Sequence, residues 1–223
     1  MSRTRFEQSL AELQDNVLAL GDMVERALGH SVDLLEQRDL EGSRQLIERD
    51  RVIDEKRYAI EAEALGLIAT QGPMAGDMRT LAAALFIANE LERIGDYAKG
   101  IGRVNVRIGP GPLMKPLIDI PRMVVACQDM LHRSLEAYAR RDVDLARAII
   151  PEDDVVDALY DQIYAELMTL VFEDMSKIRQ ANMLLMAAHN LERAADRATN
   201  ICERVIYVVT GQLLDSGWEG ATA

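Results

Sequence analysis

Apolar residues recur every three or four positions along most of this chain, which is the spacing that places them on one face of an α-helix. This period predicts helices over residues 5–37, 40–70, 77–107, 116–140, 142–172 and 176–211. In the first of them the apolar positions are Leu10, Leu13, Val17, Leu20, Val24, Ala27, Leu28 and Leu35. No segment alternates strictly between apolar and polar residues, as a half-buried strand would. The pattern therefore predicts an all-α protein with six helices.

Glycine and proline interrupt this pattern in a few places. Gln71-Gly72-Pro73 ends the second predicted helix, and four of the six prolines lie within residues 110–121. Because proline lacks a backbone N–H and clashes with the preceding turn, this segment is expected to be a linker. We therefore divide the chain into residues 1–108 and 109–223, each with three helices. The second part is expected to end in a short flexible tail, residues 214–223, in which Trp218 is the one apolar anchor.

Pro151 falls inside the fifth predicted helix. A proline in a helix interior removes one backbone hydrogen bond, so we expect the helix to kink or restart at this residue. Glu152, Asp153 and Asp154 would then lie at a helix N-terminus, where the helix dipole favours negative charge. These acids therefore have a structural explanation as well as a chemical one.

A short motif occurs twice in the chain. Leu91-Glu92-Arg93-Ile94-Gly95-Asp96 recurs 100 residues later as Leu191-Glu192-Arg193-Ala194-Ala195-Asp196. A second pair of acids precedes each copy, and further matches occur in the same order along both halves. Such order indicates duplication of a helical unit. We therefore expect two tandem three-helix bundles related by pseudo-two-fold symmetry.

The acids of each half are spaced so that they can converge. Each pair is separated by four positions, which places both carboxylates on one helix face, where they repel each other. Asp54 and Glu92 are equidistant in sequence from Pro73, and so are Asp50 and Asp96. The second half shows the same relation about its own turn. Hard oxygen donors in such a cluster suit a divalent or trivalent cation. The candidate metal ligands are Asp50, Asp54, Glu92 and Asp96 in the first half and Asp153, Asp157, Glu192 and Asp196 in the second.

Two alternatives to metal binding stay open at this point. The acids could form a solvated face paired with Arg51, Arg93 and Arg193, because surface ion pairs are common and contribute little. His189, three residues before Glu192, could be a nitrogen ligand or a histidine that serves only the structure. Pro151 and the Ala194-Ala195 replacement depart from the first repeat, so we expect the first cluster to be the better metal site.

Composition excludes several classes of function. The net charge of −12 argues against binding to nucleic acid or to an anionic membrane surface, both of which require a basic surface. No apolar run is long enough to span a bilayer, and no signal peptide is visible. Cys127 and Cys202 are isolated, which is typical of buried, reduced thiols in a cytosolic protein.

Catalysis finds little support in the sequence. It contains no glycine-rich phosphate loop and no local signature of a serine or cysteine nucleophile. A ferritin-like di-iron site requires a histidine three residues after glutamate, whereas His189 precedes Glu192. We therefore do not expect an enzyme.

Three segments of the chain resemble the PhoU family. They are Asn89-Glu-Leu-Glu-Arg-Ile-Gly-Asp-Tyr-Ala-Lys-Gly-Ile101, its echo Asn190-Leu-Glu-Arg-Ala-Ala-Asp-Arg-Ala-Thr-Asn-Ile201, and Gln71-Gly-Pro-Met-Ala-Gly-Asp-Met-Arg79. The duplicated halves and the Asp50/Asp54 pair fit as well, so the resemblance extends over nearly the whole chain. The resemblance implies two three-helix bundles whose acidic motifs can hold multinuclear clusters of iron, zinc, manganese or magnesium. It assigns the eight acids named above to two such clusters.

The resemblance also implies a role. PhoU-like proteins are cytoplasmic negative regulators of phosphate uptake and of the phosphate-starvation response. They link the ATPase subunit of the phosphate ABC transporter to a membrane sensor histidine kinase, so their contact with the membrane is indirect. We expect a non-enzymatic regulatory adaptor that forms a homodimer. The alternatives are a metal-dependent enzyme or metal store on a bundle scaffold, and a helical interaction module whose acids only confer solubility.

Overall fold

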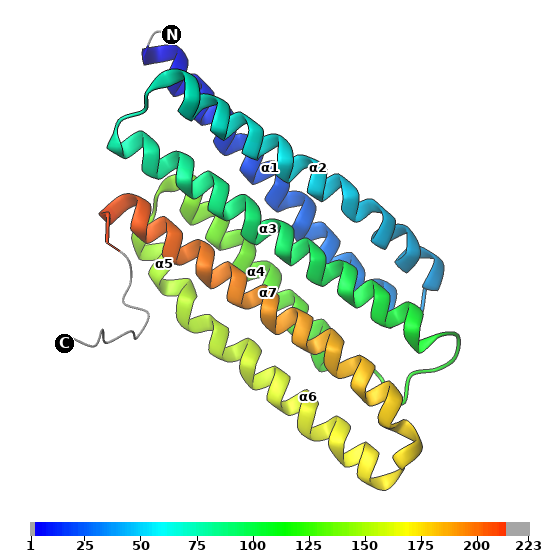
Figure 1. Ribbon diagram of the computed structural model, residues 1–223. Helices are drawn as coiled ribbons and strands as arrows, with labels where there is room; N and C mark the ends of the chain where they lie inside the picture. Colours follow the sequence, from blue (N-terminus) through cyan, green and yellow to red (C-terminus); the bar gives the residue numbers. More distant parts are fainter. Residues whose placement is uncertain (1–2, 213–223) are drawn as a thin grey trace, which may run out of the picture.

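The computed structural model describes residues 3–212, which form helices joined by short turns and, over residues 109–118, by a longer connection (Figure 1). No strand occurs in this range, so the all-α prediction is confirmed. The expected tail and Trp218 lie outside the described residues. The first half contains α1 (Arg3–Glu36), α2 (Leu40–Gln71) and α3 (Ala75–Ile108). The second contains α4 (Asp119–Arg140), α5 (Val143–Ile149), α6 (Asp153–Glu173) and α7 (Ile178–Thr210), with short 3-10 turns η1 (Ile150–Glu152) and η2 (Met175–Lys177).

The helices form two bundles that lie side by side. α1, α2 and α3 pack against one another, as do α4, α6 and α7, with α5 continuing the line of α6. α3 lies along α7 and α1 contacts α4, so equivalent helices of the two halves meet at the centre (Figure 1). The expected pair of three-helix bundles with pseudo-two-fold symmetry is therefore confirmed.

Pro151 breaks the fifth predicted helix, as expected. α5 ends at Ile149, Pro151 lies in η1, and α6 begins at Asp153. The first turn of α6 carries Asp153 and Asp154, and Glu152 is its N-cap residue. The corresponding segment of the first half is continuous within α2, because no proline interrupts it.

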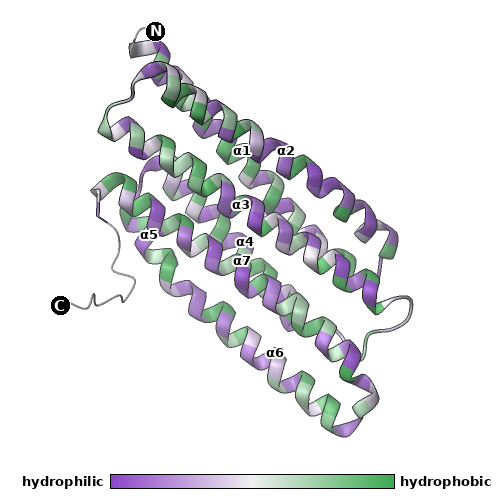
Figure 2. Cartoon of the chain, viewed as in Figure 1, coloured by the Kyte–Doolittle hydropathy of each residue, from purple (hydrophilic) through white to green (hydrophobic). Residues whose placement is uncertain are grey.

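The core follows the helical period of the sequence. Polar and apolar residues mix along every helix in Figure 2, and of the apolar positions named for the first helix all are buried except Leu10 and Ala27, which are partly buried. Within the repeated motif, Leu91 and Leu191 are both completely buried. Burying a side chain of this size contributes about 1.5–3 kcal/mol. The motif thus has two roles, because its leucine anchors the helix in the core while its acids lie on a more exposed side.

A buried polar contact joins α3 to α7. Glu90 is 3% exposed, and its Oε2 accepts hydrogen bonds from Arg197 at 3.3 Å and Asn200 at 2.9 Å. At the pseudo-symmetric position, Asn190 of α7 lies against Gly100 of α3. A Cβ added to Gly100 would lie 2.9 Å from the side-chain nitrogen of Asn190. The same pair of positions therefore meets twice across the axis, once with a hydrogen bond between Glu90 and Asn200 and once with a close approach.

Candidate metal centres

Each helical hairpin brings four carboxylates to one level. In the first half, Asp50 and Asp54 come from α2, and Glu92 and Asp96 come from α3. Burial raises the pKa of Glu92, and the charges of Asp96, Asp54 and Asp50 raise it further. This mutual influence requires the acids of the two helices to lie near one another, as their equal distances from the turn predict.

The second hairpin shows the same convergence more strongly. Burial raises the pKa of Asp153 to about 6, and the charges of Asp196, Asp157 and Glu192 add to the shift. The pKa of Asp157 is also raised, by burial and then by Glu192 and Asp196. Acids from α6 and α7 therefore share one region.

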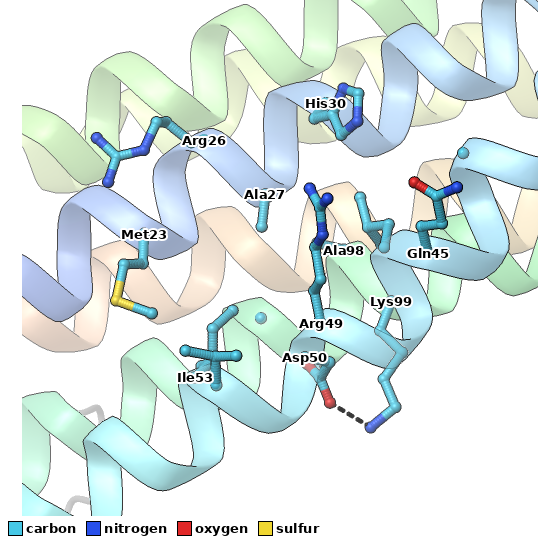
Figure 3. A pocket seen from close by; sticks show the side chains of 14 residues that line it. Met23, Arg26, Ala27, His30, Gln45, Arg49, Asp50, Ile53, Ala98 and Lys99 are labelled. Atoms are coloured by element: carbon cyan, nitrogen blue, oxygen red, sulfur yellow. Dashed lines mark hydrogen bonds and ion pairs between the residues drawn. The ribbon is translucent and has the colours of Figure 1, made fainter.

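A lysine occupies the first cluster. The Nζ atom of Lys99 donates to Asp50 Oδ2 at 2.5 Å (Figure 3). It also donates to Asp96 Oδ1 at 3.0 Å, so it joins α2 to α3. Asp50 is only 5% exposed, and the lysine side chain is 20% exposed. The hydrogen bond to Asp50 raises the pKa of Lys99, while burial raises that of Asp50 despite the lysine.

The equivalent residue of the second cluster is Thr199. Its hydroxyl donates to the backbone oxygen of Asp196 at 2.7 Å and so stays on its own helix. Asp153 Oδ1 is buried and has no hydrogen-bond partner in residues 3–212. Because a buried carboxylate oxygen without a partner is costly, this atom is where a cation is most needed.

The two alternative interpretations receive partial support. Arg193 forms an ion pair with Asp196 at 3.5 Å, whereas Arg51 pairs with Glu55 on the exposed side of α2. His189 Nδ1 lies 2.6 Å from Glu192 Oε2, which gives the histidine a structural partner. One arginine therefore pairs with the acids, but it does not neutralise four carboxylates.

The side chains of the described residues are not arranged as a complete set of metal ligands. Within residues 3–212, no group of three or more His, Cys, Asp or Glu side chains is arranged to hold a metal ion. The metal-ligand role of the eight acids therefore stays a prediction. The donor chemistry and the unpartnered Asp153 oxygen fit a hard cation in the second cluster, whereas the ammonium group of Lys99 takes that place in the first.

A cavity of about 520 Å³ lies beside the first cluster (Figure 3). Its floor is apolar, and four basic residues line it: Arg26, His30, Arg49 and Lys99. The sequence did not reveal this cavity because its walls come from three separate helices. Lys99 could have been noticed, because it lies three residues after Asp96 and therefore near the same helix face.

The cysteines play no part in either cluster. Cys127 and Cys202 are free and buried, as expected, and burial raises the pKa of both thiols, that of Cys202 to about 12. Both therefore stay protonated at neutral pH and are poor metal ligands or nucleophiles. None of the helices within residues 3–212 has the length of apolar sequence that a bilayer crossing requires.

A duplicated three-helix bundle with an acidic cluster in each hairpin defines a class of all-α repeat proteins. The family of the chain follows from direct comparison. The sequence model of the PhoU domain matches residues 17–104 and again residues 120–205, and this chain belongs to the PhoU family. The family consists of regulatory accessory proteins rather than enzymes.

Relatives match the chain along nearly its whole length. A phosphate-specific transport system accessory protein PhoU homolog of Clostridium acetobutylicum is 35% identical over 216 residues, which cover 96% of this chain and 99% of the relative. A protein of the same description from Synechocystis is 36% identical, over 94% and 93% of the two chains. The crystal structure of PhoU from Pseudomonas aeruginosa superposes with a TM-score of 0.88 at 31% identity, covering 93% of this chain and 100% of that one.

Proposed function

We propose that this protein is a cytoplasmic negative regulator of phosphate uptake and of the phosphate-starvation response. It would act as a metal-binding adaptor between the ATPase subunit of the phosphate ABC transporter and a sensor histidine kinase. The observation that carries this proposal is the full-length similarity to proteins described as phosphate-transport accessory proteins. Because the family model matches residues 17–104 and 120–205, the similarity includes both halves.

An adaptor needs an accessible surface for its partners. The turn between α6 and α7 carries three exposed apolar side chains: Phe172 is 85% exposed, Met175 64% and Ile178 45%. Exposed apolar side chains that gather in one place are typical of protein interaction sites. This turn is therefore our candidate contact surface for the transporter ATPase or the kinase, and contact with the membrane would be indirect, through these partners.

The metal-binding part of the proposal rests on the second cluster above all. Asp153, Asp157, Glu192 and Asp196 offer hard oxygen donors, and the unpartnered Asp153 oxygen supplies a place for positive charge. A bound cation would neutralise the mutual repulsion of these acids and hold α6 against α7. Metal would thereby change the rigidity of the hairpin whose turn carries the candidate contact surface.

Deletion of the gene in its source organism tests the regulatory role. Under phosphate excess, deletion should raise phosphate uptake and the expression of phosphate-responsive genes, and the wild-type copy should restore both. Uptake of radiolabelled phosphate and transcript levels are the measurements. Unchanged uptake and unchanged expression in the deletion strain would contradict the proposed role.

A pull-down read by mass spectrometry tests the partners. The wild-type protein should retain the ATPase subunit and the kinase, and Phe172→Asp should retain less of at least one of them. Val125→Asp, at an equally apolar and 65% exposed position on α4, is the matched control and should retain both. Light scattering on the same preparations tests the expected homodimer. Equal retention by the two variants would remove the α6–α7 turn from the proposal.

A further inference from the structure

The two acidic clusters differ at one equivalent position, which is Lys99 in the first half and Thr199 in the second. We propose that Lys99 acts as an internal cation that closes the first cluster, so that the two repeats have divided roles. The first cluster is a permanent ammonium clamp between α2 and α3, and only the second takes up metal. This inference rests on the metal-binding function proposed above and specifies which half performs it.

The geometry of Lys99 supports the clamp. Its Nζ reaches Asp96 on its own helix and Asp50 on the neighbouring one, at 3.0 and 2.5 Å. Hydrogen bonds between two charged groups are roughly twice as strong as neutral ones. The lysine side chain is 20% and that of Asp50 5% exposed, so water screens this pair less than it would screen a surface pair. The ammonium group therefore supplies the bridge between helices that a metal ion would otherwise supply.

Entry of a metal into the first cluster would have to displace this bridge. Asp50 on α2 and Asp96 on α3 are two of the four acids through which a cation could join these helices, and both already bind the ammonium group. A metal would leave the lysine amine partly buried beside a second positive charge, which is unfavourable. The formal charge of the four acids also falls from −4 to −3 when Lys99 is counted, which weakens their attraction for a cation.

The second cluster has the opposite properties. Asp153 corresponds to Asp50 in the repeat, so the carboxylate that Lys99 holds in the first half has a bare, buried oxygen in the second. Thr199 carries no charge and bonds to its own helix. The ion pair between Arg193 and Asp196, at 3.5 Å, lies within α7 and does not join it to α6. Nothing in the described part of the second cluster substitutes for a cation between the two helices.

Exchanging the two residues tests the inference on the full-length protein. Wild type, Lys99→Thr, Thr199→Lys and the double exchange are loaded with Mn²⁺, desalted and measured by elemental analysis. Metal per chain should rise about twofold in Lys99→Thr and should fall at least tenfold in Thr199→Lys. The double exchange should return it to the wild-type level. In the wild type, Asp153→Asn should remove the metal and Asp50→Asn should not. Loss of metal in Asp50→Asn, or no gain in Lys99→Thr, would overturn the proposal.

A second measurement separates this inference from the metal-binding function itself. In the presence of a chelator, Lys99→Met should lower the midpoint of thermal unfolding, because it keeps the apolar stem and removes only the charge. Thr199→Lys should raise the midpoint, since it adds the missing cation to the second cluster. If no variant binds metal but both shifts occur, the metal function fails and the ammonium clamp stands. If neither midpoint moves in the chelated protein, the clamp is wrong whatever the metal content.

Discussion

At the scale of single residues, Asp153 is the group whose chemistry depends most on what surrounds it. Burial and four neighbouring carboxylates raise its pKa from 3.8 to about 6. The folded protein therefore holds this proton more tightly than the unfolded chain does. The free energy of unfolding must then fall as the pH rises from 3.8 to about 6, and the full loss is present at neutral pH.

Asp153→Asn should accordingly stabilise the metal-free protein at pH 7. The shift corresponds to an upper bound of about 3 kcal/mol, and because the side chain is partly exposed, solvent screening reduces the expected gain to about 1 kcal/mol. Urea unfolding at pH 5 and pH 7 in the presence of a chelator measures the gain. Asp154→Asn, in the same turn but exposed, is the control and should change stability less. A variant less stable than wild type at pH 7 would show that Asp153 is not strained by its neighbours.

The sequence predicted which acids converge, because helical spacing and equal distance from a turn are local properties. It did not predict which of the two clusters is more suited to a cation. We expected the first cluster to be the better metal site, on the basis of Pro151 and Ala194-Ala195, whereas Lys99 argues for the second. The lysine was visible in the sequence at the right spacing. Its reach to Asp50 on a neighbouring helix depends on packing and so could not be derived.

At the scale of secondary-structure elements, Pro151 is the clearest case of sequence determining structure. η1 lies where α2 runs on without interruption in the first half, and proline is the physical reason for the break. The position of α6 does not depend on that break alone, because Val156, Leu159, Ile163 and Leu167 bury one face of the helix. The acids of α6 are therefore fixed by packing against α7 as well as by the turn.

Pro151→Ala should consequently join α5 to α6 without moving the acids. The new amide can donate within the helix, which favours the variant, while the lost rigidity of proline in the unfolded chain opposes it. We expect the free energy of unfolding to change by less than about 1 kcal/mol. Hydrogen exchange in residues 147–153 should slow, and metal content should stay at the wild-type level. Loss of metal in this variant would show that the η1 turn, and not packing, positions Asp153.

The C-terminal ends of the first and fourth helices were predicted to within one residue, but the sequence did not indicate what holds the turns that follow them. Arg38 and Arg141 both end a helix in the left-handed conformation, with φ of 58° and 55°, at positions where glycine is the usual signal. Tertiary contacts hold them there: Arg38 donates to the backbone oxygen of Gly111 at 3.3 Å, and Arg141 donates to Thr80 at 3.2 Å. The local sequence does not indicate such contacts. The repeated Arg-Asp dipeptide was the one available sign, since the aspartate that follows each arginine caps the next helix.

At the scale of the whole molecule, the duplication predicted two bundles but not how they meet. The interface runs along α3 and α7, and its centre is polar at one place. Glu90 is buried there with Arg197, whose side chain is 13% exposed, and with Asn200. A buried ion pair is seldom a large source of stability, but removing one partner leaves an unpaired charge away from water. The contact therefore specifies how the halves dock.

Glu90→Ala should destabilise the protein by about 3–5 kcal/mol, because Arg197 would stay buried without a partner. Replacing both residues by methionine should be much less harmful, since no charge is then left in the interface. Urea unfolding of the single and double variants measures the difference. We further expect the single variant to unfold in two steps, because the unpaired charge would weaken the interface that couples the two halves. A single variant that matches the double variant in stability and still unfolds in one step would show that apolar packing alone holds α3 against α7.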